Sequence, residues 1–258
     1  MTVFNAYSDE SSGADRRSMF YYAGYVAPKS DWEDIFAPLW DERVLKGPPR
    51  IPYLHMTDIR KEVWRQEHGI TRSEGEFRID EAVGVLSAIP TLMPVGSQLN
   101  ASTVLDVFQQ KFLTKKGARK KMAPDYFGFL AYAFVVLKYV SENYPGAERV
   151  DFFVENNGEI TKHIQEFHGT IEGNLRALGS PRMASLLGDL IPAGKDMLPL
   201  QAADVGCWFS RRSWEHSLDQ RDLKRMRKLK NGLLQIWKDD RVEALYREAI
   251  QRENGIQE

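Results

Sequence analysis

Acidic residues inside apolar segments are the feature that most constrains how this chain can fold. Asp9 and Glu10 follow the first apolar run, Glu155 ends a second run, and Asp204 lies within a late amphipathic segment. Carboxylates are almost never fully buried unless they are paired or bind a metal ion. The fold is therefore expected to bring Asp9, Glu155 and Asp204 together into one site that holds a divalent cation.

Each of these acids also has an ordinary structural interpretation. Taken one at a time, helix caps, turn caps and ion pairs are the commoner roles of such residues. The partners would be Ser11 or Ser12 for Asp9, Asn156 and Asn157 for Glu155, and Arg211 or Arg212 for Asp204. Taken together, in the order strand, strand, helix, the metal site is the favoured interpretation.

Composition places the chain among ordinary globular proteins. Its 258 residues are 43% hydrophobic and 28% charged, enough to bury a large core without disulfides. The net charge of -1 gives no overall attraction to nucleic acid or to an anionic membrane, so any electrostatic binding surface must be local.

The cellular setting is inferred from what the chain lacks. The single cysteine, Cys207, cannot form an internal disulfide, and its apolar neighbours predict a buried, inert thiol. The longest strongly apolar run, residues 127–137, is shorter than the roughly 20 residues that span a bilayer. The first ten residues have no signal-like pattern. We expect a cytoplasmic protein with no membrane partner.

Strand and helix patterns alternate along the chain. Residues 3–10 and 19–26 predict a β-hairpin, and residues 149–155 (RVDFFVE) are the clearest single strand. Further strands are expected at residues 91–99 and 182–190. Helices are expected at residues 31–45, with Ser30 as the N-cap, and at 80–89, 124–143, 158–178, 198–214, 221–237 and 241–252.

This order predicts an α/β fold with one mixed β-sheet flanked by helices. The chain is expected to form a single domain over residues 1–258. Residues 28–78 are interpreted as an insertion after the first hairpin, irregular beyond residue 47 except around residues 55–59. Residues 216–258 are interpreted as a helical C-terminal extension.

Two motifs resemble a known family. Residues 7–11 (YSDES) resemble its opening tyrosine-x-aspartate-glutamate-serine strand end, and residues 198–204 (LPLQAAD) resemble its closing leucine-glutamine-x-alanine-aspartate helix. His55, followed by residues 57–59, resembles a weaker third element. The family is domain of unknown function 3800, and the resemblance covers about residues 3–215. It implies a ribonuclease H-like mixed β-sheet.

The resemblance also implies a metal site. In the ribonuclease H-like superfamily, acids on the first strand, the fourth strand and the last core helix bind Mg²⁺ or Mn²⁺. By resemblance, Asp9, Glu155 and Asp204 take these places. Our hypothesis adds Glu10 as a fourth acid, a direct or outer ligand, and His55 as an assisting group. Glu155 stands where many relatives of the fold carry aspartate, and the opening turn is one residue longer than usual.

The expected function is divalent-metal-dependent hydrolysis of phosphodiester bonds in nucleic acid, RNA or DNA. Two divalent ions roughly 3.5–4 Å apart can neutralise charge at the phosphorus and activate a water molecule. Two alternatives stay open: a non-catalytic nucleic-acid or protein interaction module on the same scaffold, and a metal-dependent phosphatase that acts on small phosphoesters.

Other motifs are weaker. A basic cluster that could bind a phosphate backbone comprises Lys115, Lys116, Arg119, Lys120 and Lys121, and a second basic group spans residues 211–230. The second group is more simply a solvated helix face. The five histidines show no HxxxH or HExxH spacing, and the chain has no GxSxG or GxxxxGK[ST] motif, so zinc-hydrolase, acyl-transfer and NTPase functions lack support.

Overall fold

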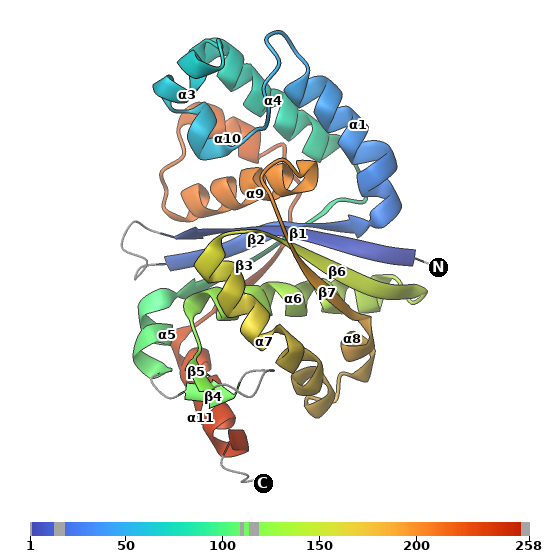
Figure 1. The fold of residues 1–258 in the computed structure, drawn as a ribbon, viewed down its shortest axis with the longest axis vertical. Helices are drawn as coiled ribbons and strands as arrows, with labels where there is room; N and C mark the ends of the chain where they lie inside the picture. Colours follow the sequence, from blue (N-terminus) through green and yellow to red (C-terminus); the bar gives the residue numbers. More distant parts are fainter. Residues whose placement is uncertain (1, 13–18, 109–110, 114–118, 254–258) are drawn as a thin grey trace.

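A mixed six-stranded β-sheet separates two layers of helices (Figure 1). The structure, a computed structural model, describes residues 2–12, 19–108, 111–113 and 119–253. In spatial order the strands are β7 (Leu187–Ala193), β6 (Ala147–Glu155), β1 (Thr2–Ser12), β2 (Met19–Pro28), β3 (Met93–Asn100) and β8 (Leu233–Trp237). The expected α/β class with one mixed sheet is confirmed.

Strand direction follows from the connections. β2 runs antiparallel to both of its neighbours, β1 and β3, and its pairing with β1 aligns Tyr7 with Tyr25. β6 runs parallel to β1, and β7 runs parallel to β6, to which α7 and α8 connect it. β8 adds parallel to β3 at the opposite edge.

Side-chain alternation along β1 assigns its two faces. Phe4 and Ala6 pack into the hydrophobic core on one face, whereas Tyr7 packs into the core on the other. Tyr7 stacks on Phe153 of β6, with ring centroids 4.5 Å apart. Because side chains in a strand alternate, Asp9 lies on the same face as Tyr7.

The layer on the Tyr7 face contains most of the first 90 residues together with a late helix (Figure 1). Its helices are η1 (Asp31–Phe36), α1 (Ala37–Trp40), η2 (Asp41–Leu45), α2 (Met56–Ile59), α3 (Glu62–Glu67), α4 (Arg72–Ala88), α9 (Leu198–Trp214) and α10 (Gln220–Met226). α9 lies directly on β1 and β2.

The opposite layer covers the other face of the sheet (Figure 1). Its helices are α5 (Ala101–Val107), α6 (Pro124–Asn143), α7 (Gly158–Ala177), α8 (Pro181–Leu186) and α11 (Asp239–Glu253), and a small hairpin is formed by β4 (Lys111–Leu113) and β5 (Arg119–Lys121). Among the helices that the structure describes, none has the length and apolar character needed to cross a membrane.

The segment η1–α1–η2 forms one continuous helical stretch, as the sequence predicted for residues 31–45. Its buried residues Trp32, Phe36, Trp40 and Val44 are spaced by four. That spacing exceeds the 3.6 residues of an α-helical turn, and the wider π-helical turns at both ends keep these side chains on one face. Ser30 has helical backbone angles and makes no side-chain cap, so its predicted role as N-cap was wrong.

Predicted and observed elements agree best where the sequence pattern is long. α6 and α9 have their predicted bounds, and α7 ends one residue before the predicted end. α4 begins at Arg72, eight residues earlier than expected, because Thr71 and Glu74 form a capping box at its start.

Three predictions near strands were wrong. β1 continues to Ser12, so Asp9 and Glu10 lie inside the strand rather than at its end, and the first two residues of a turn expected at residues 11–15 are strand; residues 13–15 of that turn lie outside the described residues. Residues 181–186 form α8, and β7 begins only at Leu187. Residues 233–237 form β8 instead of helix, so the C-terminal extension is not wholly helical.

The segment 47–75 is more regular than its sequence suggested. It contains α2, α3 and the start of α4, and the prediction of order around residues 55–59 is confirmed by α2. Arg78 of α4 is buried and donates to the carbonyl oxygens of Val44, Gly47 and Pro49, which holds the turn after η2 in place.

A buried arginine joins the C-terminal extension to this layer. The Arg225 side chain is 2% exposed, and its guanidinium contacts Glu76 and Asp80 of α4 at 2.7 Å and Asp222 at 2.9 Å. Arg221 contacts the same two acids of α4 from a side chain that is 51% exposed.

We expect Arg225→Met to destabilise the protein by about 3–5 kcal/mol, because its loss leaves three partly buried acids without their shared cation. The matched change Arg221→Met should cost less than about 1 kcal/mol, since water already screens that ion pair. Urea denaturation of both variants measures the difference, and equal losses would show that burial does not set the strength of this contact.

Candidate functional site

Three separate elements bring the predicted acids to one place. Asp9 and Glu10 lie on β1, and Glu155 ends the neighbouring parallel strand β6, one residue past the last paired residues, Ser8 and Val154. Asp204 lies on α9, which covers the face of the sheet that carries Asp9. Glu10, the next residue on β1, points to the opposite face, where α7 lies. We call Asp9, Glu10, Glu155 and Asp204 the acidic cluster.

A glycine lets α9 approach the sheet closely. A Cβ atom at Gly206 would lie 2.9 Å from the ring of Tyr25, so a larger residue there would push the helix away from β2. This close approach places Asp204, two residues earlier on α9, against the strands. Asp204 is only 9% exposed.

The pKa of Asp9 is raised by burial and by every other member of the acidic cluster. It is 7% exposed, and burial raises its pKa well above the ordinary value. The carboxylates of Glu10, Asp204 and Glu155 raise this pKa further, and the backbone N–H of Glu10, which donates to Asp9 Oδ1 at 2.9 Å, opposes them. Asp9 therefore lies in a strongly negative environment.

Glu10 points to the start of α7. Its carboxylate accepts a hydrogen bond of 2.6 Å from the side-chain amide of Asn157. Burial raises the pKa of Glu10 to about 7; the hydrogen bond from Asn157 lowers it, and Glu155 raises it. From the sequence, Asn157 was expected only as a capping partner of Glu155. In the structure its side chain donates to Glu10 instead.

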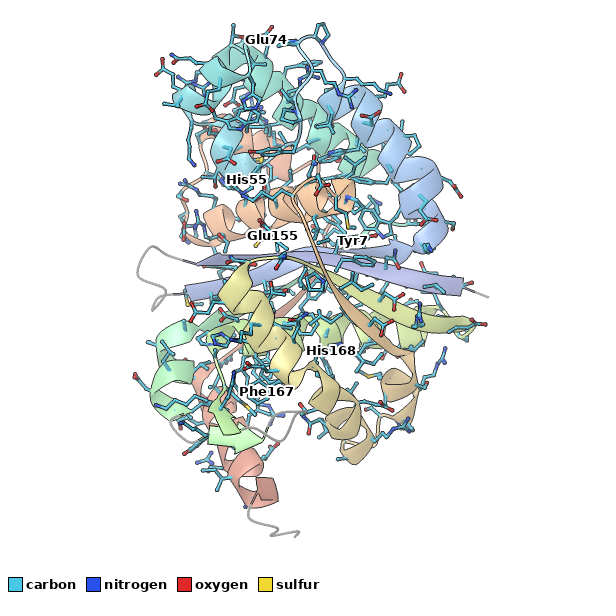
Figure 2. The ribbon with its side chains drawn as sticks, in the orientation of Figure 1. Tyr7, His55, Glu74, Glu155, Phe167 and His168 are labelled. Atoms are coloured by element: carbon cyan, nitrogen blue, oxygen red, sulfur yellow. The ribbon has the colours of Figure 1, made fainter. Side chains whose placement is uncertain are left out.

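Asp204 is held by the loop that precedes α2. Its Oδ2 accepts a hydrogen bond of 2.6 Å from the backbone N–H of Met56, and its Oδ1 lies 3.7 Å from Nε2 of His55. Burial raises the pKa of Asp204, whereas His55 and the Met56 N–H lower it. In Figure 2, His55 lies beside α9 and Glu155 lies at the level of the sheet below it.

His55 is oriented by a second acid. Its Nδ1 lies 2.8 Å from Asp58 Oδ2, and the other Asp58 oxygen accepts from Lys61 Nζ at 3.0 Å. Although burial works against it, these contacts with Lys61 and His55 hold the pKa of Asp58 below its ordinary value. The imidazole is thus fixed between two carboxylates, Asp58 at Nδ1 and Asp204 at Nε2.

A buried glutamine organises the surrounding loops. Gln201 Oε1 accepts hydrogen bonds from Trp40 Nε1 at 2.9 Å and from the backbone N–H of Leu54 at 3.0 Å. Its Nε2 donates to the carbonyl oxygen of Lys195 at 3.1 Å. One side chain, three residues before Asp204 on α9, therefore fixes both the His55 loop and the loop that carries Lys195.

Lys195 is a site residue that the sequence interpretation missed. Its Nζ lies 3.7 Å from Glu155 Oε1, and its charge also lowers the pKa of Asp204. In the sequence it belonged only to a predicted turn, residues 192–195. Gln201 could be singled out from the sequence because it belongs to the LPLQAAD motif. The motif did not indicate which atoms its side chain would bind.

The carboxylate oxygens of the acidic cluster are suited to a hard cation. Asp9, Glu155 and Asp204 come from three elements, and carboxylate oxygens are the ligands that Mg²⁺ and Mn²⁺ prefer. Within the described residues, however, no three His, Cys, Asp or Glu side chains are arranged so that they could hold a metal ion as they stand. The chemistry of the cluster fits a divalent cation, and the carboxylates would have to move together to hold one.

The remaining sequence candidates lie elsewhere. Lys115 and Lys116 lie outside the described residues, and Lys120 forms an ion pair with Glu166 of α7, in the helical layer on the far side of the sheet from Asp204. In the second basic group, Arg225 is buried against α4, so it is not part of an exposed binding face. Cys207 is buried, as predicted.

Comparisons with known proteins return nothing: no family model matches the chain, and neither the curated proteins nor the solved structures include a significant match. The inference of function therefore depends on the side-chain arrangement described above.

We expect Gln201→Met to destabilise the protein by about 3 kcal/mol, because three polar groups on Trp40, Leu54 and Lys195 lose their hydrogen-bond partner. The control Gln66→Met, at an exposed position on α3, should change stability by less than about 0.5 kcal/mol. Equal urea midpoints for the two variants would contradict the central role of Gln201.

The acidic cluster should make the metal-free protein sensitive to pH. Folding raises the pKa of Glu10 from its ordinary 4.5 to about 7, so its contribution to stability is fully present below pH 4.5 and is lost as pH rises through 7. Asp9 acts in the same direction. Glu10→Gln should therefore raise Tm by a few degrees at about pH 8 in EDTA and leave it unchanged at about pH 4.5.

The control for this experiment is Glu142→Gln, which removes an exposed acid paired with Lys138 on α6. It should not produce the same pH-dependent gain. If Glu10→Gln keeps the wild-type dependence of Tm on pH, then Glu10 is solvated and folding does not raise its pKa.

Proposed function

We propose that this protein is a divalent-metal-dependent nuclease that hydrolyses phosphodiester bonds in RNA or DNA. One observation carries the proposal: the Asp9 carboxylate is buried on β1, and its pKa is raised by burial and by the charges of further acids on β1, α9 and β6. Buried like charges destabilise a fold, and such clusters are typical of sites that bind cations.

The architecture supports a ribonuclease H-like fold and membership of the domain of unknown function 3800 family. The first three strands form an antiparallel meander, and β6 and β7 add parallel to β1 on its other side. The acids lie on the first strand, on the strand beside it and on a helix packed over both. This is the placement that the resemblance of the two motifs implies.

Asp9, Glu155 and Asp204 would hold Mg²⁺ or Mn²⁺, with Glu10 at the margin of the site. Carboxylates that repel one another without a cation would be drawn together by the ion. When bound, such ions supply charge neutralisation at the phosphorus and an activated water molecule.

His55 is suited to moving a proton in this site. With Asp58 ionised, Nδ1–H donates to Asp58, which leaves Nε2 as the basic nitrogen facing Asp204. The buried loop contacts through Met56 and Gln201 keep the imidazole at this position.

Metal binding is the first test. Mn²⁺ at about 100 times its Kd should stabilise the wild type by about 2.7 kcal/mol, an increase in Tm of several degrees. Asp9→Asn and Asp204→Asn should lose this response, whereas Asp34→Asn, at an exposed position on η1, should keep it. Thermal unfolding with Mn²⁺ and with EDTA measures the effect.

Cleavage is the second test of the same proposal. Labelled single- and double-stranded RNA and DNA should be cut with Mg²⁺ or Mn²⁺ and not with EDTA. Asp9→Asn should lower the rate by at least roughly 100-fold, or about 2.7 kcal/mol in the activation barrier. A protein that responds to Mn²⁺ but cuts no substrate would be a metal-binding interaction module, and the nuclease proposal would be wrong.

A further inference from the structure

Lys195 brings a positive charge to the edge of the acidic cluster. It lies in the short connection between β7 and α9, and its Nζ is 3.7 Å from Glu155 Oε1. Its charge also acts on Asp204, which comes from a different element. The ammonium group therefore faces two acids that the proposed metal ion would need as ligands.

The Lys195 backbone is fixed while its side chain is not. The carbonyl oxygen accepts from the buried Gln201, and the turn around it is closed by a hydrogen bond from Met197 N–H to Gly194 O at 3.1 Å. The side chain is 46% exposed, and its contact with Glu155 exceeds hydrogen-bond distance. Such a half-exposed ion pair is weak, so the ammonium can leave Glu155 at small cost.

Lys195 offsets part of the negative charge of the acidic cluster when no metal ion is bound. The acidic cluster contains four carboxylates, and within the described part of the chain Lys195 brings a charged ammonium group to it, at Glu155 Oε1. A divalent ion bound by Glu155 would draw on the negative charge of the same carboxylate that Lys195 faces. The two cations must therefore compete.

We propose that Lys195 is an internal counter-ion of the metal-free cluster, and that it moves from Glu155 to a phosphate oxygen of the substrate when a divalent cation binds. This inference rests on the proposed function. A lysine ammonium is a compact point charge on a flexible stem, suited to phosphate in either position. Its fixed backbone keeps that phosphate within reach of the metal site.

The competition can be measured without catalysis. Lys195→Gln should bind Mn²⁺ about three- to fivefold more tightly than the wild type in calorimetric titrations at low salt, the range expected for losing one partly exposed ion pair. Lys195→Arg should stay near the wild-type affinity because it keeps the charge. Lys138→Gln removes the same charge from an exposed pair on α6 and should have no effect.

Substrate contact is read from a short phosphorothioate oligonucleotide, chosen to resist cleavage. With Mn²⁺, Lys195→Gln should weaken its binding and lower the slope of log Kd against log salt by about one, as expected for one lost phosphate contact. In EDTA the variant and wild type should bind alike, because Lys195 then faces Glu155.

The outcomes separate the two proposals. A wild type with no Mn²⁺ binding overturns the proposed function and this inference together. A wild type that binds Mn²⁺, with Lys195→Gln showing unchanged or weaker Mn²⁺ affinity, overturns the counter-ion role alone. Tighter Mn²⁺ binding without any loss of oligonucleotide affinity overturns the phosphate contact.

Discussion

The burial of Asp9 among other carboxylates is the interaction on which the rest of this site depends. A carboxylate on a central strand, covered by a helix, is costly unless a cation or strong donors compensate it. Asp9 accepts a hydrogen bond from the backbone N–H of Glu10, whereas Asn157 donates to Glu10 and the Met56 N–H donates to Asp204. Burial and the neighbouring carboxylates outweigh the hydrogen bond to Asp9, so its pKa lies well above the ordinary value.

The helical layer over the sheet serves this cluster as a support. Residues 28–78, interpreted from sequence as an insertion, supply His55, Asp58 and Met56 to the neighbourhood of Asp204. Gln201 ties this segment to α9 and to the Lys195 loop, and Arg225 ties α4 to the C-terminal extension. Buried contacts of this kind hold the side chains around Asp204 in a defined geometry.

The sequence predicted the elements that carry the acids because their patterns are long and local. α9 was predicted at its observed bounds from its apolar spacing, and Phe153 and Glu155 were placed on one face of their strand by simple alternation. β8 was missed because Leu233 and its neighbours form a strand only by pairing with β3. Its five residues carry too little periodicity to reveal a distant partner.

The sequence by itself determined which acids would be costly to bury and which strands and helices carry them. Each of these follows from the residues that neighbour an acid along the chain. Only the tertiary structure decided which groups face those acids. Lys195 reaches Glu155 and His55 reaches Asp204 because α9, β6 and the segment around α2 pack against one another. Electrostatic contacts depend on distances in space, and packing between distant segments sets those distances.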